Sequence, residues 1–91
     1  HIILSGVFNY KYCADENEHR RIVFNIIQRL YVIANQTLSI DFMSPYVDFV
    51  AENSYHQDIG SIMEFCISKC TRKVVIDHSY MDYEFTCHLM K

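Results

Sequence analysis

The chain has 91 residues, of which 51 % are apolar and 21 % are charged, and its formal net charge is −3. This length holds one hydrophobic core, so we expect a single domain over 1–91, folded rather than disordered. The acidic balance excludes a nucleic-acid partner, because phosphate binding needs a basic surface. No apolar run approaches the about 20 residues that span a bilayer, so no membrane span is predicted.

Residues 1–12 are apolar without helical spacing, which predicts an extended arm laid on the rest of the domain. A helix is predicted from Asp15 to about Asn35, because Asp15 and Glu18 have the spacing of a capping box. Apolar residues occur on nearly all of its faces, which indicates a central or interface helix. The many β-branched residues leave a strand as an alternative for 21–27.

The dipeptide Ser44-Pro45 predicts the start of a short second helix, because serine caps helices and proline is tolerated at the first helical position. This helix would end near Ser54, and residues 36–43 would connect it to the first helix. Its inward side chains would be Tyr46 or Val47, Val50 and Ala51.

The clearest helical pattern covers 59–70, where apolar residues recur at helical spacing. They are Ile59, Ile62, Met63, Cys66, Ile67 and Cys70. A last helix, begun by Asp77 or Ser79, would present Tyr80, Tyr83, Cys87 and Met90 on one face. The predicted fold class is therefore all-α: a small, disulfide-stapled bundle of about four helices with an extended N-terminal arm.

Four cysteines in so short a chain favour a disulfide framework. Cys66 and Cys70 point the same way from one helix, so each should bond to a different element. If the helix at 59–70 and the last helix form a hairpin, Cys87 lies at the height of Cys66. This favours Cys66–Cys87 with Cys13–Cys70, and Cys70–Cys87 with Cys13–Cys66 is a close alternative. Four reduced cysteines that act as small buried hydrophobes are the remaining alternative.

Three features together predict a secreted, extracellular protein. Disulfides are typical of secreted domains, and a removed signal peptide would explain a chain that begins at His1. The tripeptide Asn35-Gln36-Thr37 matches the N-glycosylation pattern, so Asn35 is a candidate glycosylation site.

Catalytic and metal chemistry are not indicated. Zinc could use Cys66, Cys70 and Cys87 with His78 or His88, but their spacing does not match known zinc motifs, and we predict no metal and no cofactor. The histidines are dispersed, and two glycines leave no glycine-rich elbow or phosphate loop, so we predict no enzymatic activity.

Thirteen aromatic residues are too many for one small core, so some should line an apolar pocket or a partner surface. The candidates are Phe24, Tyr31, Phe49, Met63 and Phe65. The leading hypothesis is a secreted, non-enzymatic binding protein, a hormone-, cytokine- or toxin-like factor acting on a protein partner or receptor. One alternative is a carrier of a small apolar ligand held between helices. Another is an intracellular helical interaction module with reduced thiols or zinc. The expected contact surface of the binding protein is the excess apolar and aromatic area of the first helix and the N-terminal arm, and the same surface could also mediate homo-oligomer formation.

Overall fold

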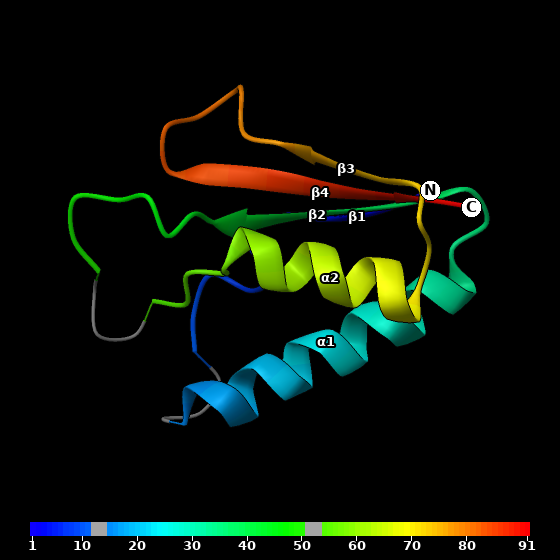
Figure 1. The fold of residues 1–91 in the computed structure, drawn as a ribbon, viewed down its shortest axis with the longest axis horizontal. Coiled ribbons are helices and arrows are strands. Elements are labelled where there is room, and N and C mark those ends of the chain that lie inside the picture. Colours follow the sequence, from blue (N-terminus) through cyan, green and yellow to red (C-terminus); the bar gives the residue numbers. More distant parts are fainter. Residues whose placement is uncertain (12–14, 51–53) are drawn as a thin grey trace.

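A computed structural model of the chain describes residues 1–11, 15–50 and 54–91. Within these ranges the chain forms four β-strands and two α-helices (Figure 1). In chain order they are β1 (Ile2–Leu4), α1 (Glu16–Ile33), β2 (Thr37–Met43), α2 (Ile59–Lys69), β3 (Val74–Asp77) and β4 (Glu84–Met90).

The strands form one mixed sheet in the order β1-β2-β4-β3. β1 lies parallel to β2, whereas β4 runs antiparallel to both of its neighbours. The longest pairing joins β2 to β4, from Thr37 opposite Met90 to Met43 opposite Glu84. Both helices lie on the same face of the sheet (Figure 1), so the described residues make a two-layer α/β fold.

The predicted all-α bundle of four helices is wrong. The predicted connector over 36–43 and the predicted last helix contain the two central strands, β2 and β4. Along β4, Phe85, Cys87 and Leu89 are buried, whereas the residues between them are half-buried. This alternation is the two-residue period of a strand. Cys87 and Met90 therefore lie on opposite faces instead of sharing a helical face. β2 alternates in the same way.

The first and third predicted helices are present close to their expected bounds. Asp15 caps α1, where its carboxylate accepts from the N–H of Asn17 at 2.9 Å. Asp58 caps α2, where its carboxylate accepts from the N–H of Ser61 at 2.9 Å. The side chains that these helices bury are spaced four residues apart, namely His19, Val23 and Ile27 in α1 and Ile62 and Cys66 in α2.

The N-terminal arm predicted over 1–12 is extended at Ile2–Leu4, which form the short edge strand β1, but residues 6–9 form turns and bends instead. After β1 the chain turns at Gly6, whose φ of 70° is a conformation that favours glycine. The Asp41 carboxylate in β2 holds this turn: it accepts from the Gly6 N–H at 2.7 Å and from the Ser5 hydroxyl at 3.0 Å. The turn is thus fastened to the strand beside it.

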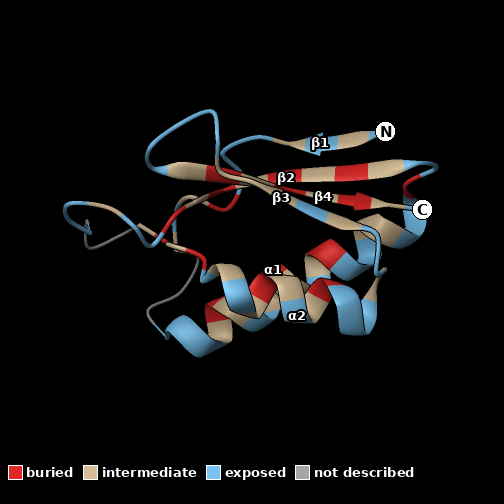
Figure 2. Cartoon of the chain, turned by 45° about the horizontal axis from the view of Figure 1, so that its top comes forward, coloured by how far each residue is buried: buried red, intermediate tan, exposed pale blue. Residues whose placement is uncertain are grey.

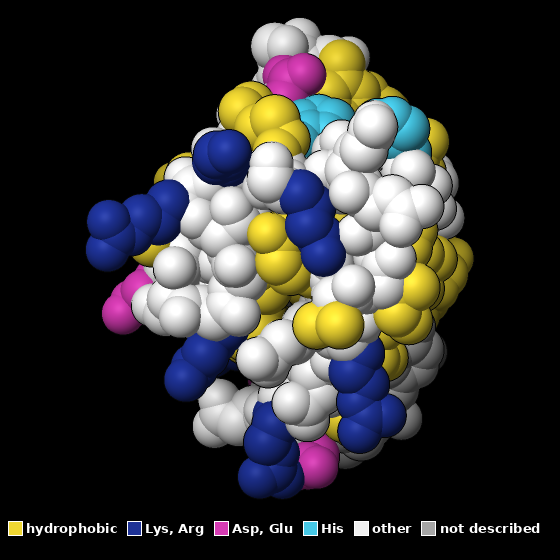
Figure 3. Space-filling model, turned by 90° about the vertical axis from the view of Figure 1, so that its right-hand side faces the viewer, with side chains coloured by type: hydrophobic (Ala, Val, Ile, Leu, Met, Phe, Trp, Pro, Cys, Tyr) yellow, Lys and Arg dark blue, Asp and Glu magenta, His cyan; other side chains and the backbone are white. Residues whose placement is uncertain are grey.

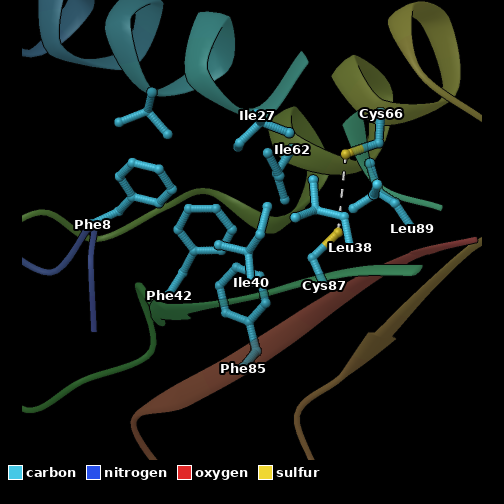
Figure 4. Close-up of a cluster of buried hydrophobic side chains, with 12 residues drawn as sticks. Phe8, Ile27, Leu38, Ile40, Phe42, Ile62, Cys66, Phe85, Cys87 and Leu89 are labelled. Carbon is cyan, nitrogen blue, oxygen red and sulfur yellow. Dashed lines mark hydrogen bonds between the residues drawn. The ribbon is translucent and has the colours of Figure 1, made fainter. Parts of the chain in front are cut away.

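The core lies between the two helices and the inner face of the sheet, where the buried positions of the strands and helices face one another (Figure 2). Phe42 lies at its centre, with the ring of Phe8 at 5.8 Å and that of Phe85 at 5.5 Å between centroids. Both pairs are stacked (Figure 4). Each fully buried side chain of this size contributes about 1.5–3 kcal/mol of transfer free energy.

Among the described residues, neither helix has the length together with the apolar character needed to cross a bilayer.

Candidate functional site

A buried serine just after β2 joins three segments of the chain. The Ser44 N–H donates to the Tyr83 carbonyl at 2.9 Å, and the Ser44 carbonyl accepts from Nδ1 of His56 at 2.9 Å. The Ser44 hydroxyl accepts from the Tyr46 N–H at 3.1 Å. Because Ser44 is fully buried, its polar groups need these partners. The bonds therefore fix the segment after β2 against the residues before α2 and the connection between β3 and β4.

The short helix predicted after Ser44 is absent from the described residues 45–50, so this prediction is wrong there. The serine does bond the N–H two residues on, as a cap would, but its main chain is engaged by Tyr83 and His56. These non-local bonds keep the backbone in an irregular path. Tyr46 and Val50 are exposed instead of inward, and Ala51 lies outside the described residues.

A pocket of about 160 Å³ opens beside this junction. It is lined by Met43, Val47, Asp48, Phe49, Ser54, His56 and Tyr83. Most of its wall is carbon, and Asp48 is the one carboxylate among the lining residues; its Oδ2 accepts from the Tyr83 hydroxyl at 3.1 Å. An engineered cavity of about 150 Å³ is large enough for benzene. The pocket therefore fits one ring or one short aliphatic chain.

The apolar side chains that line the pocket, together with two exposed ones next to them in the chain, form a surface that we call the β2–α2 patch. Its members are Met43, Tyr46, Val47, Phe49, Val50 and Tyr83. Phe49 is 79 % exposed and Tyr46 is 73 % exposed, although both are large and apolar. Single exposed apolar residues are common, but a contiguous group of this kind marks an interaction surface.

The structure divides the five residues predicted for an apolar pocket or interface. Phe49 lines the pocket, but Phe24, Tyr31 and Phe65 are not among its lining residues. The rings of Phe24 and Phe65 stack on each other at 4.3 Å between centroids, where α1 meets α2. Met63 is half-buried on α2 and does not line the pocket either. The pocket thus lies at the end of the sheet instead of between the helices.

Two of the predicted disulfide cysteines lie close together in the core. The sulfur atoms of Cys66 and Cys87 are 4.0 Å apart, about twice the length of a disulfide bond, and both residues are buried (Figure 4). The thiol contact with Cys87 and the burial raise the pKa of Cys66. Both are free thiols in this structure, at positions from which a bond could form.

The second predicted bridge cannot be followed, because Cys13 lies outside the described residues. Its predicted partner, Cys70, ends α2 and is a half-buried free thiol. Burial, and then the neighbouring Cys66, raise the pKa of Cys70 to about 11. The Cys13–Cys70 bridge stays a prediction.

The open face of the sheet carries a pair of residue types that also occur in nucleophilic catalysis. The Ser39 hydroxyl lies 2.8 Å from Nδ1 of His88, directly across the β2–β4 pairing. A nucleophile also needs donors that stabilise an oxyanion, but the backbone N–H groups of two paired central strands lie in the plane of the sheet and bond across it. This pair is best explained as a cross-strand hydrogen bond.

Two other sequence predictions can be placed. Among the described residues, no group of three or more His, Cys, Asp or Glu side chains could hold a metal ion. Asn35 is exposed in the connection between α1 and β2, a position that a glycosylating enzyme could reach.

No protein-family model, curated protein or solved structure matches this chain. The function must therefore be inferred from the geometry of the site.

Sequence reasoning missed every lining residue of the pocket except Phe49, namely Met43, Val47, Asp48, Ser54, His56 and Tyr83. These residues come from separate segments that Ser44 brings together. The one local signal was Ser44-Pro45, which indicates a turn as well as a helix start. Nothing in the sequence pattern linked it to Tyr83.

Proposed function

We propose that this protein is a non-enzymatic binding domain that recognises another protein through the β2–α2 patch. The observation that carries the proposal is the exposure of Phe49, 79 % of whose surface is open beside an apolar pocket. Covering an aromatic side chain of this size contributes about 1.5–3 kcal/mol, and such anchors dominate protein interfaces.

The rigidity of the junction supports the same function. Ser44 ties the patch to the sheet through the Tyr83 carbonyl and to the segment before α2 through His56. A surface that is held in place before binding loses less conformational entropy when the partner arrives. The patch is therefore suited to recognition without a large rearrangement.

We further propose that the protein acts outside the cell, as a hormone-, cytokine- or toxin-like factor. The proximity of the Cys66 and Cys87 sulfurs and the exposure of Asn35 support this location. Intact mass of the protein from its natural source, measured before and after reduction, tests it. A gain of hydrogen on reduction is expected, whereas an unchanged mass would favour the intracellular alternative with reduced thiols.

Selection of peptides from a displayed random library tests the binding function. Peptides selected on the wild-type domain should lose at least about tenfold in affinity for Phe49→Ala, because one apolar anchor is worth about 1.5–3 kcal/mol. Ile3→Ala is the matched control, since Ile3 is 75 % exposed but lies on the β1 edge of the sheet. Both variants should fold with wild-type stability.

The proposed site fails if no peptide can be selected, or if the selected peptides bind Phe49→Ala as tightly as the wild type. Equal losses for Phe49→Ala and Ile3→Ala would also contradict it, because the binding would then be general apolar adhesion.

A further inference from the structure

The pocket in the β2–α2 patch combines apolar walls with an uncompensated carboxylate. Asp48 lines it together with the apolar side chains of Met43, Val47 and Phe49. The Tyr83 hydroxyl donates to Oδ2 of Asp48 and so orients the carboxylate without neutralising its charge. Asp48 forms no ion pair with any described residue. A ligand that brings a positive charge would supply the missing partner.

His56, in the wall of the pocket, also has a ring nitrogen without a hydrogen-bond donor. Nδ1 of His56 must donate to the Ser44 carbonyl, because a carbonyl can only accept. Nε2 of the neutral ring is then an acceptor, and it has no hydrogen-bond partner among the described residues. The exposed carboxylate of Asp48 therefore favours a ligand that carries hydrogen-bond donors, and the buried Nε2 of His56 leaves one further acceptor in the pocket wall.

The chain segments that form the pocket are also acidic. Segments 37–68 and 74–90 contain eight of the eleven acidic residues and none of the eight Lys and Arg residues. These segments supply the whole lining of the pocket. An approaching cation would therefore meet no Lys or Arg side chain from the segments that form the site.

Basic side chains gather at the other end of the sheet. Lys73 and Lys91 are there, because the Lys73 carbonyl accepts from the N–H of Met90 and Lys91 follows directly on the same strand. Figure 3 looks at this end and shows several Lys and Arg side chains on it. The pocket lies beyond Met43, at the far end of β2, which is about 20 Å long. Lys73 and Lys91 are thus kept away from the pocket, whereas Arg20 lies near Tyr55 and Asp58, so the charge separation between the two ends of the sheet is partial.

We propose that the pocket binds a Lys or Arg side chain of the partner protein, an inference that rests on the proposed function. The aliphatic stem would lie against Met43, Val47 and Phe49, as the stems of long basic side chains do on apolar surfaces. The charged group would reach Asp48, and the rings of Phe49 and Tyr83 would add a cation–π contribution.

Blocked pentapeptides of the form Gly-Gly-X-Gly-Gly, with X as Lys, Arg, norleucine or Glu, provide the test. Binding to the ¹⁵N-labelled domain is followed by shifts of the backbone amides that line the pocket. The Lys and Arg peptides should bind about tenfold more tightly than the norleucine peptide, the combined effect of one partly exposed ion pair and a cation–π contact. The Glu peptide should bind least.

Asp48→Asn removes the charge but keeps an acceptor for the Tyr83 hydroxyl. The preference for Lys and Arg over norleucine should disappear in this variant. Asp82→Asn is the matched control: Asp82 is also exposed and lies next to Tyr83 in the chain, but it does not line the pocket. Asp82→Asn should keep at least half of the wild-type affinity ratio of the Lys and Arg peptides to the norleucine peptide.

The inference is overturned if the norleucine peptide binds as tightly as the Lys peptide, or if the preference for Lys and Arg over norleucine persists in Asp48→Asn. Either result would leave the proposal of the apolar patch as a protein-binding surface intact. Absence of shifts at the pocket amides with all four peptides would also overturn the inference. The selection experiment with Phe49→Ala would then decide separately whether the wider patch binds protein.

Discussion

The sulfur of Cys66 in α2 lies 4.0 Å from the sulfur of Cys87 in β4, so a thiol–thiol contact joins the helical layer to the sheet. Both residues belong to the buried core (Figure 4). A bond between them would require only a small approach of two side chains that already face each other.

We predict that refolding in a glutathione redox buffer joins Cys66 to Cys87. The two thiols would lose two protons and two electrons, and one glutathione disulfide would become two glutathione molecules. Closing a loop of about 20 residues should raise the free energy of unfolding by about 3 kcal/mol. Denaturant unfolding of the oxidised and reduced forms measures this difference.

The reduced, folded protein should oxidise much more slowly than the refolding chain, because burial and a raised pKa leave little Cys66 thiolate to react. Cys70→Ala is the control that should keep the stabilisation, whereas Cys87→Ala should abolish it. A stabilisation retained in Cys87→Ala would show that another pair had formed.

A buried histidine should make stability depend on pH. Burial, and then the charge of Lys11, lower the pKa of His19, whose ring packs edge-on against Tyr55 at 4.2 Å between centroids. The unfolded chain then binds this proton more readily than the folded protein does. The stabilising effect of the neutral, buried His19 is therefore present above about pH 6.5 and is lost as the pH falls below that value. The slope from this group is at most about 1.4 kcal/mol per pH unit.

Denaturant unfolding at pH 7.5, 6.5 and 5.5 measures the pH effect. His19→Gln should flatten the curve, because glutamine does not titrate. Gln28→Ala, a change at an exposed, non-titrating residue of the same helix, is the control and should leave the slope in place. A slope that is the same in wild type and His19→Gln would rule out this role for His19.

Phe42 should be among the costliest positions to truncate, since its ring stacks with both Phe8 and Phe85. Phe42→Ala removes both contacts and leaves a cavity in a fully buried site, which costs about 3–5 kcal/mol. Phe49→Ala makes the same chemical change at an exposed site and should cost less than about 0.5 kcal/mol. Thermal unfolding of the two variants compares them directly.

Asp41 should hold β1 in place. Asp41→Asn removes one of the two acceptors that fix Ser5 and the Gly6 turn, and should cost about 1 kcal/mol. Hydrogen exchange should quicken in the β1–β2 pairing and stay unchanged between β3 and β4. Asp77→Asn alters the carboxylate at the end of β3 that accepts from the Ser79 N–H, and is the control. Faster exchange throughout the sheet in Asp41→Asn would contradict a local role.

The two helices could be predicted because their signals are local. Asp15 caps α1 within three residues, and the apolar spacing of α2 stands in one continuous segment. The strands were misread because two patterns fit the same residues. Tyr80, Tyr83, Cys87 and Met90 have helical spacing, while Phe85, Cys87 and Leu89 have strand spacing. Pairing of β4 with β2, far away in the chain, decides between the two patterns.

The pocket could not be predicted for a similar reason. Phe49 is a candidate because of its aromatic character, but its position beside Tyr83 depends on the backbone bonds of Ser44. Such bonds leave no periodic trace in the sequence. Composition and motif spacing therefore indicated that spare aromatic surface exists, without indicating where it lies.

The shortness of β1 has a consequence for association between copies of this chain. Three residues hold β1 on the edge of β2, and its release would leave the main-chain groups of Ser39, which face β1, unpaired. An uncovered strand edge is a template for another chain. The segment most suited to fill it is the same first strand of a second molecule, so weakening the Asp41 fastening should promote reciprocal exchange of N-terminal strands.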